Sequence, residues 1–197
     1  MNAPVTAARI ADHPVDPQFL NRWSPRAFTD DAMTQADVLS LLEAARWAPS
    51  ASNLQPWRFV WGLRGDAGFA GIAATLVPFN EMWATNAAAL VVVASKTMSL
   101  KDDVAQPNPY HAFDTGAAWA QLALQAHLNG WAAHGMAGFD HEVLATNVGL
   151  PVDHVLHAVV AVGRPGDPAS LPDFLKNMEH PSGRRSLTET AHHGKFA

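Results

Sequence analysis

The chain has 197 residues, 48% of them hydrophobic and 16% charged, and this length suits one domain with one buried core. Thirteen basic and eighteen acidic residues give a net charge of −5, which disfavours nucleic acid as a partner. Cysteine is absent, so disulfides, thiolate metal sites and cysteine nucleophiles are excluded.

No stretch of the sequence suits a membrane. The longest strongly apolar run, residues 87–94, is far shorter than the about 20 residues of a spanning helix. Residues 1–11 contain only Arg9 as a charge and lack the extended apolar core of a secretory signal. We therefore expect a cytoplasmic protein without a membrane partner.

The first predicted features are an arm and a short polar segment. Residues 1–16 have no clear period, which predicts an arm over the surface or a disordered segment. Arg22, Ser24 and Arg26 then lie within five positions at a predicted helix end. Guanidinium groups bind phosphate through paired hydrogen bonds, and a serine hydroxyl can add another. Taken alone, the simpler interpretation is two solvated arginines on a surface turn.

A capped helix and a strand follow. Thr34 and Asp37 form a capping box, and apolar residues recur at helical spacing as far as Ala45. Pro49 ends this helix because the residue before a proline is disfavoured in the helical conformation. Alternating aromatic and β-branched residues at 57–61 predict a strand.

The loop between this helix and this strand, residues 48–56, is a candidate binding element. Asn53, Gln55 and several backbone amides can point in one direction, which suits recognition of a planar ligand. The alternative is that both amide side chains only satisfy backbone groups of the loop.

The middle of the chain predicts a short helix, a buried strand and a loop. Turn-forming residues fill 62–71, and a short helix is expected at 72–76. The bounded β-branched run at 90–94 predicts a central strand covered on both faces. Residues 98–110 are polar, contain two prolines and have no period, so they predict an exposed loop or lid.

A long apolar helix is predicted next. Asp114 is a good N-cap, and residues 116–128 are apolar around most of the helix circumference, as in a helix buried on several sides. Their alanines and glycine allow close approach of another helix, such as the same helix of a second subunit. Asn129 and Gly130 end the helix.

The last third predicts a turn, a helix and a strand. Gly135 and Gly138 let the backbone approach a ligand and donate amide hydrogen bonds, or they form a simple strand turn. A capped helix at 140–148 and a buried strand at 155–163 follow, with His157 expected to be packed or hydrogen-bonded. Beyond this strand the chain has little periodicity and is expected to wrap outward.

The ten histidines predict no metal site. The closest groupings are His154 with His157 and His192 with His193, and neither has a carboxylate partner at ligand spacing. The sequence also lacks the G-x-S-x-G turn of many hydrolases and the G-K-[ST] phosphate loop. Hydrolase and nucleoside-triphosphatase functions therefore lose their main support.

Several of these segments, in this order, resemble the nitroreductase family of flavin mononucleotide (FMN) enzymes. The most specific is A-P-S-x-x-N-x-Q-P-W-x-F at 48–59. The others are R-x-S-x-R-x-F at 22–28, D-x-G-A-A at 114–118, G-x-x-G-F-D at 135–140, and a basic pair followed by x-L-x-E at 184–189. One departure is Ala120, where the family usually has an amide side chain near this position.

The resemblance implies the fold and the assembly. It implies an α+β fold of three layers, in which a central, mainly antiparallel sheet is flanked by helices. One FMN-binding domain would cover residues 17–197. Two copies would form an intertwined homodimer with FMN at the interface.

The resemblance also implies how the cofactor is held. Arg22, Ser24 and Arg26 would grip the phosphate and ribityl chain, and backbone amides of Ala137 and Gly138 would bond to N5, the nitrogen that accepts hydride. The full implied set of cofactor-binding residues is Arg22, Trp23, Ser24, Arg26, Pro49, Ser50, Ala51, Asn53, Gln55, Asn80, Met136, Ala137, Gly138, Arg184 and Arg185. The choice between the last two stays open.

Two subunits would share each site. Pro49, Ser50 and Ala51 would reach the flavin of the partner, whereas Asn53 and Asn80 would serve their own subunit. No side chain is expected to act as an obligatory catalytic acid, because the proton can come from solvent.

The expected substrate pocket contains Trp83, Tyr110, His111 and Phe113. Trp83 stands where one branch of the family has a lysine, and it either packs in the core or lines the pocket with an aromatic face. His111 is equally interpretable as a surface histidine. Ala137 replaces a glutamate of the same branch, which does not affect a backbone donor.

The implied function is an FMN-dependent oxidoreductase that uses NADH or NADPH. Hydride would pass to N5, and a nitroaromatic, quinone or similar small electrophile would then take it in a ping-pong reaction. Alternatives on the same fold are reduction of enones or semialdehydes, reductive dehalogenation, and oxidation of peptide-derived rings. Two further classes are a flavin-binding protein without turnover and a flavin-free interaction protein.

Overall fold

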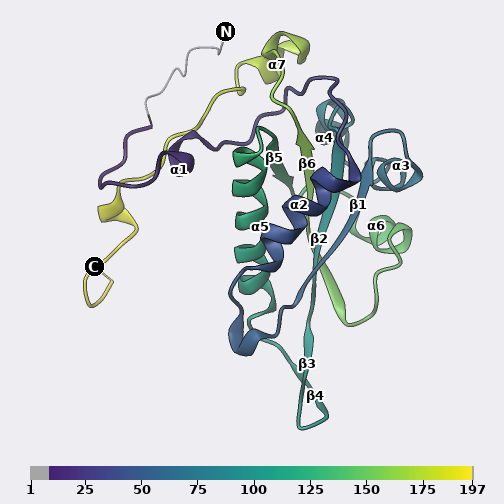
Figure 1. Cartoon of the computed structure of the whole chain (residues 1–197), viewed down its shortest axis with the longest axis vertical. Helices are drawn as coiled ribbons and strands as arrows, with labels where there is room; N and C mark the ends of the chain where they lie inside the picture. Colours follow the sequence, from purple (N-terminus) through teal and green to yellow (C-terminus); the bar gives the residue numbers. More distant parts are fainter. Residues whose placement is uncertain (1–8, 197) are drawn as a thin grey trace.

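The protein is organised around a four-stranded antiparallel sheet (Figure 1). The structure is a computed structural model that describes residues 9–196. The strands lie in the order β1, β2, β6, β5, and each neighbouring pair is antiparallel. Their bounds are Trp57–Leu63 for β1, Ala89–Lys96 for β2, Ala132–Met136 for β5 and His154–Gly163 for β6.

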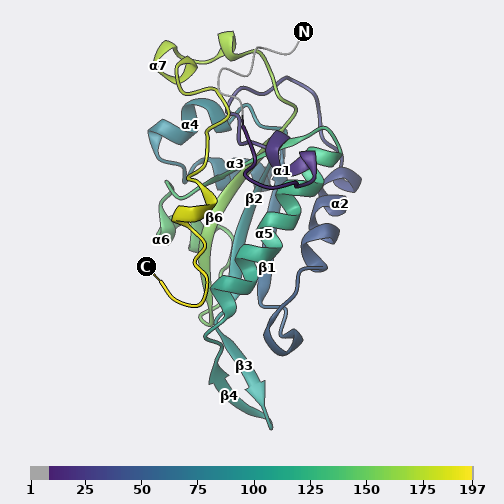
Figure 2. The same cartoon turned by 90° about the vertical axis from the view of Figure 1, so that its left-hand side faces the viewer.

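Helices cover both faces of this sheet. α2 and α5 lie on one face, while α3, α4 and α6 lie on the other (Figure 2). The helices span Gln35–Arg46 for α2, Ala67–Ala73 for α3, Pro78–Ala84 for α4, His111–Leu128 for α5 and His141–Asn147 for α6. The expected three-layer α+β fold with a mainly antiparallel sheet is confirmed.

The central strand β2 joins the two halves of the core. Successive side chains of a strand point to opposite faces. Val91 and Val93 therefore pack beneath α2 and α5, whereas Leu90 and Val92 pack against α3 and α4. Every residue of β2 except Lys96 is buried, which confirms the predicted strand covered on both faces.

The expectations for residues 62–76 are wrong in detail. β1 continues to Leu63, and α3 begins at Ala67, ahead of the predicted helix. Asp66 sets this start, because its carboxylate accepts a hydrogen bond from the Phe69 amide at 2.7 Å. Of the glycines in this stretch, Gly65 does lie in a turn, with φ 97°, whereas Gly62 lies in β1, and Gly68 and Gly71 lie in α3.

The predicted loop or lid is largely a hairpin. β3 (Met98–Lys101) pairs with β4 (Val104–Pro107), and the hairpin projects from one end of the sheet (Figure 1). Asp102 and Asp103 form its turn with positive φ angles of 49° and 63°, which match the twist of a two-residue hairpin. All four residues of β4 are exposed, so the alternation that identifies a half-buried strand is missing.

α5 begins before the predicted cap. Tyr110 occupies the N-cap position, so the expectation that Asp114 caps this helix is wrong. Asp114 is instead 3% exposed, and its carboxylate accepts the amide of Ala51 at 3.1 Å. This bond ties α5 to the loop before β1. The predicted helix end at Asn129 and Gly130 is confirmed.

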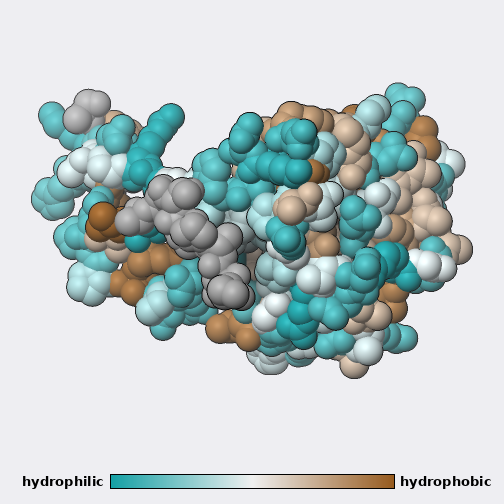
Figure 3. All heavy atoms as spheres, turned by 90° about the horizontal axis from the view of Figure 1, so that it is seen from above, coloured by the Kyte–Doolittle hydropathy of each residue, from teal (hydrophilic) through white to brown (hydrophobic). Residues whose placement is uncertain are grey.

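The two ends of the described chain lie side by side away from the sheet (Figures 1 and 2). Arg9 Nε donates to the Ser182 carbonyl at 2.9 Å, and the Leu187 amide donates to Asp12 at 2.7 Å. Seen from above, they form a lobe with exposed hydrophobic side chains beside the main body (Figure 3). The expected outward path of the C-terminal segment is confirmed, and residues 1–8 of the expected arm lie outside the described residues.

The remaining short helices belong to these peripheral parts and to the loop before β1. They are α1 (Pro17–Asn21), α7 (Asp173–Lys176), and single 3-10 turns at Ala51–Asn53, Pro168–Ser170 and Leu187–Glu189. None of the helices in residues 9–196 is long and apolar enough to cross a membrane.

Candidate functional site

Three arginines from distant parts of the chain gather next to α1. Arg9 donates to the carbonyl oxygens of Leu20 at 2.8 Å and Arg22 at 2.7 Å, so it lies against the segment that carries Arg22. Burial, and after it the charge of Arg184, lowers the pKa of Arg22. Among the described residues, none of the three forms a salt bridge. This arginine cluster, Arg9, Arg22 and Arg184, therefore attracts anions.

A cavity of about 490 Å³ adjoins the arginine cluster. It lies among α1, α5 and β5, and Arg22, Ser24, Trp119 and Gly135 contribute to its wall. Gly135 allows the Trp119 ring to lie close to β5, because a Cβ at this position would lie only 3.2 Å from that ring. A second cavity of about 420 Å³ includes Ser24 in its lining, together with Trp23, Arg26 and His134. Ser24 therefore lies between the two spaces.

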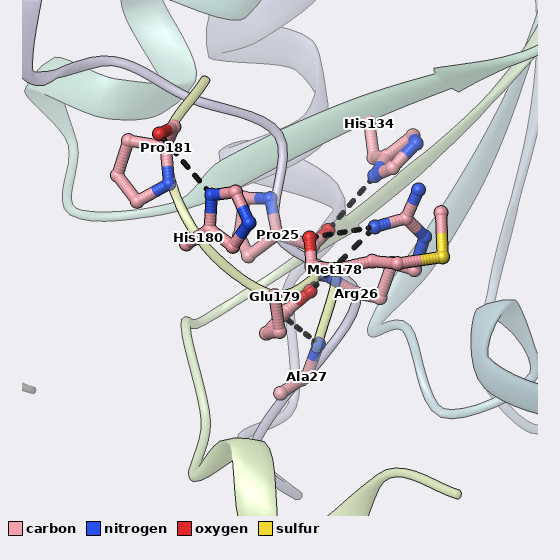
Figure 4. A network of polar contacts seen from close by, with 8 residues as sticks. All are labelled: Pro25, Arg26, Ala27, His134, Met178, Glu179, His180 and Pro181. Atoms are coloured by element: carbon pink, nitrogen blue, oxygen red, sulfur yellow. Dashed lines mark hydrogen bonds and ion pairs between the residues drawn. The ribbon is translucent and has the colours of Figure 1, made fainter. Parts of the chain in front are cut away.

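Arg26 is held more tightly than the arginine cluster. Its Nη1 lies 3.8 Å from Glu179 Oε2, and its guanidinium carbon lies 5.9 Å from the centroid of the Trp83 ring. His134 also packs on Trp83, with ring centroids 4.6 Å apart, and its Nδ1 donates to the Pro25 carbonyl at 3.1 Å (Figure 4). Burial lowers the pKa of His134, which favours the neutral ring.

The segment after β5 presents backbone donors. The amides of Ala137 and Gly138 donate to no acceptor within the described residues. Asn80 on α4 donates its side-chain amide to the Gly138 carbonyl at 2.9 Å. A Cβ at Gly138 would lie 2.7 Å from Asn80 Nδ2, so a larger residue there would displace the Asn80 side chain. Met136 itself is 4% exposed and packs in the core.

The loop before β1 stands apart from these cavities. Pro49, Ser50 and Ala51 lie with Asn53 near the N-terminal end of α5, whereas the 490 Å³ cavity lies further along that helix. Ser52, Asn53 and Gln55 have positive φ angles of 49°, 55° and 46°. Such conformations cost energy and cluster at functional sites.

Gln55 has a local role in this loop. Its side chain donates to the Asn53 carbonyl at 3.1 Å, and its backbone amide donates to Ser50 Oγ at 3.0 Å. The interpretation in which loop side chains satisfy loop backbone groups therefore holds for Gln55. Asn53 groups with Ser50 and Ala51 by position, not with Arg22 and Ser24.

The expected substrate-pocket residues have different environments. Trp83 is fully buried in the core, which agrees with the core-packing alternative given for it. Tyr110 and Phe113 are exposed near the start of α5. His111 lies 2.7 Å from the buried Ser95 Oγ through Nδ1, and is therefore not a free surface histidine. His157 Nε2 lies 2.7 Å from the same oxygen, which confirms a hydrogen-bonded role.

Several site residues carried no recognisable sequence signal. Arg9 lies in an arm without periodicity, and Glu179 lies in the equally irregular C-terminal segment. His134 was only one polar residue inside a strand. Both candidate arginines near the C-terminus are exposed, and of the two it is Arg184 whose charge acts on Arg22.

Together, these features suit a ligand with an anionic end and a planar polar part. The arginine cluster and Ser24 supply donors for a phosphate. The unpaired amides after β5 can donate to a ring nitrogen or oxygen, and the cavities lined by Gly135 and His134 of β5 provide room. Arg26 Nε is buried without a partner in the described residues, as expected of a donor next to a ligand site. The residues present therefore fit a flavin mononucleotide.

Comparisons with known proteins agree with this geometry. A crystal structure described as an oxidoreductase containing FMN has a TM-score of 0.94, is 40% identical, and covers 100% of this chain and 99% of its own. A structure from Desulfovibrio desulfuricans in complex with FMN has a TM-score of 0.72 and 25% identity, covering 95% of this chain and 100% of its own.

Sequence comparisons give the same family. A relative from Archaeoglobus fulgidus, whose name combines NADH dehydrogenase and NAD(P)H nitroreductase, is 29% identical over 152 residues, or 74% of this chain and 82% of the relative. The family model described as the nitroreductase family matches residues 20–74 and 65–164. Because these matches span well over half of the sequence, the chain belongs to the nitroreductase family.

Proposed function

We propose that the protein is an FMN-dependent oxidoreductase that uses NADH or NADPH to reduce small electrophiles such as nitroaromatics and quinones. The observation that carries this proposal is the arginine cluster, which has no carboxylate partner among the described residues and adjoins a 490 Å³ cavity. Family membership and the FMN-containing relatives support it. When bound, FMN supplies a nitrogen that takes up hydride from the nicotinamide and returns it to the acceptor.

The arginine cluster would hold the phosphate. Arg22 Nη1 lies 3.4 Å from Ser24 Oγ, so the guanidinium and the hydroxyl can reach the same phosphate oxygens. Arg184 joins them from the C-terminal segment. Arg9 adds charge, and it fixes the carbonyl of Arg22 through a 2.7 Å hydrogen bond.

The segment after β5 would align the flavin ring. Ala137 and Gly138 offer backbone amides, and Asn80 fixes the Gly138 peptide through its carbonyl oxygen. Arg26, held beside Trp83 near the second cavity, would stabilise negative charge on the reduced ring. These groups are fixed before the ligand binds, so they need little reorganisation during hydride transfer.

A second copy of the chain would complete each site. Asp114 holds the loop of Pro49, Ser50 and Ala51 at one end of α5, away from the cavity that its own chain forms. We assign Asn53 to the same set, together with the exposed Tyr110 and Phe113. In a homodimer with α5 at the interface, these residues would line the partner's flavin.

The first test is the absorption spectrum of the purified protein, followed by addition of NADH or NADPH without oxygen. We expect flavin bands that bleach on reduction, and nitroaromatics or quinones should restore them. Bands that do not bleach would indicate a flavin-binding protein without turnover. A protein that stays colourless after incubation with FMN would contradict the proposal.

Arg22→Ala tests the phosphate site. The variant loses a charged hydrogen-bond donor, so we expect FMN binding to weaken by about 1.5–3 kcal/mol, which is roughly ten- to 150-fold in dissociation constant. Titration of FMN fluorescence measures this change. Arg46→Ala is the matched control, because Arg46 pairs with Glu43 on the exposed face of α2. Equal FMN affinity in both variants would remove Arg22 from the site.

A further inference from the structure

Glu179 is a buried carboxylate in the C-terminal segment. Its side chain is 1% exposed, and Oε1 accepts the backbone amides of Arg26 at 2.7 Å and Ala27 at 2.8 Å (Figure 4). Burying a carboxylate is costly unless it is hydrogen-bonded or paired. These two bonds therefore fasten residues 24–27 to the C-terminal segment.

The same contact places the Arg26 side chain. Its Nη1 lies 3.8 Å from Glu179 Oε2 and 3.4 Å from the Met178 carbonyl, and Trp83 limits it on another side. Arg26 Nε, Trp83 Nε1 and Glu179 Oε2 are all buried without a hydrogen-bond partner in the described residues. Buried polar atoms in a protein core normally have hydrogen-bond partners, so three unpaired atoms this close together are more typical of a ligand site.

We propose that Glu179 is a positioning residue of the cofactor site. Its two backbone hydrogen bonds hold residues 24–27 in the conformation in which Ser24 and Arg26 face FMN. This inference rests on the proposed function, and it gives the C-terminal segment a role beyond the contribution of Arg184.

The role is geometric, so side-chain length matters more than charge. Glu179→Gln keeps an oxygen of the same reach, which can accept both amides. Glu179→Asp keeps the charge but is one methylene shorter, so its carboxylate cannot reach both amides without movement of the chain. If residues 24–27 are no longer held in place before FMN binds, they must be ordered during binding, and this cost weakens the affinity for FMN.

The test is titration of FMN fluorescence with the full-length chain. We expect Glu179→Asp to weaken FMN binding about tenfold and Glu179→Gln to stay within about threefold of wild type. Glu142→Gln is the control, because Glu142 is an exposed glutamate on α6 with no side-chain hydrogen bond in the described residues. Equal losses in Glu179→Gln and Glu179→Asp would overturn the geometric assignment.

A double-mutant cycle separates positioning from general stability. If Glu179 acts through Arg26, combining Glu179→Asp with Arg26→Ala should weaken binding by less than the product of the two single effects. Additive effects would mean that Glu179 does not place the Arg26 side chain, and would overturn the inference. Suppose that the wild type binds FMN, that Arg22→Ala weakens this binding and that Glu179→Asp does not. The inference about Glu179 would then be overturned, and the proposed function would stand. A wild type that binds no FMN would overturn both.

Discussion

Ser95, His111 and His157 form a partly buried network that favours the neutral form of His157. Ser95 is fully buried, and its Oγ lies 2.7 Å from a ring nitrogen of each histidine. A hydroxyl has one hydrogen, so it donates to one ring and accepts from the other. Two protonated rings would both donate, which leaves the hydroxyl hydrogen without a ring acceptor. They would also place two positive charges on rings whose centroids are 5.9 Å apart.

His157 should therefore make stability depend on pH. Burial, and after it the charge of His111, lowers the pKa of His157 from its ordinary value of 6.5. Below that pH the unfolded chain binds more protons than the folded chain, so the free energy of unfolding decreases as the pH falls. In His157→Gln, the free energy of unfolding should decrease less steeply as the pH falls. The difference in slope should stay below about 1.4 kcal/mol per pH unit, which is the largest effect that one proton can have.

Urea unfolding at about pH 7.5 and about pH 5.5 checks this prediction, with FMN at one fixed concentration. His193→Gln, a change in the exposed C-terminal segment, should keep the wild-type pH dependence. If His157→Gln lost stability as steeply as wild type, the network would not be the source of the effect.

At the scale of elements, α3 packs on β1 because Gly62 has no side chain. A Cβ at Gly62 would lie 1.9 Å from the backbone nitrogen of Phe69, so Gly62→Ala should destabilise the protein by about 3 kcal/mol. Gly71, inside α3, has no atom within 4 Å of an added Cβ. Gly71→Ala should therefore stabilise the protein by about 0.5–1 kcal/mol. Thermal unfolding midpoints that moved in the same direction would contradict this contrast.

Elements that bury one face or both could be predicted from the sequence, because burial imposes a hydrophobic period. The capping box at Thr34 and the buried run at 90–94 each led to the observed element. The hairpin at 98–107 could not be predicted, because its strands pair only with each other and β4 is exposed. The start of α3 was missed because Gly62, Gly68 and Gly71 read as turn residues although each serves a strand or helix.

In the candidate site, too, some residues could be predicted from local sequence patterns and others could not. Arg22, Ser24 and Gly138 came from short local motifs, and the structure places all three beside the cavities or the open backbone amides. Arg9 and Glu179 depend on contacts between the two ends of the chain, which no local pattern encodes. For Trp83 both alternatives stayed open, because composition does not reveal whether an aromatic side chain faces a pocket or the core.

At the scale of the whole molecule, α5 has one face that its own chain leaves open. Phe113 is 81% exposed, and Gly116 and Ala120 are exposed on the same helix. Glycine in a helix costs about 1 kcal/mol relative to alanine, and nothing lies within 4 Å of a Cβ added at Gly116. Contacts within one chain do not explain why a glycine stands at this helical position. Close approach of a helix from a second subunit would explain it.

Gly116→Arg should therefore separate the subunits of the proposed homodimer without disturbing the fold of each. The new side chain has room within one chain, but it would hold two α5 helices apart and bring two like charges together at a symmetric interface. Because each flavin site would need the partner's loop, FMN should be lost together with the dimer. Light scattering after size-exclusion chromatography, combined with flavin absorbance, measures both.

Val152→Arg is the matched control for this change. It places the same charge on a fully exposed apolar residue before β6 and should keep both the dimer and the flavin. A Gly116→Arg protein that stayed dimeric with full FMN would place the interface elsewhere. A monomer that retained full FMN would show that one chain forms the whole site, and the role proposed for Pro49, Ser50 and Ala51 would then fail.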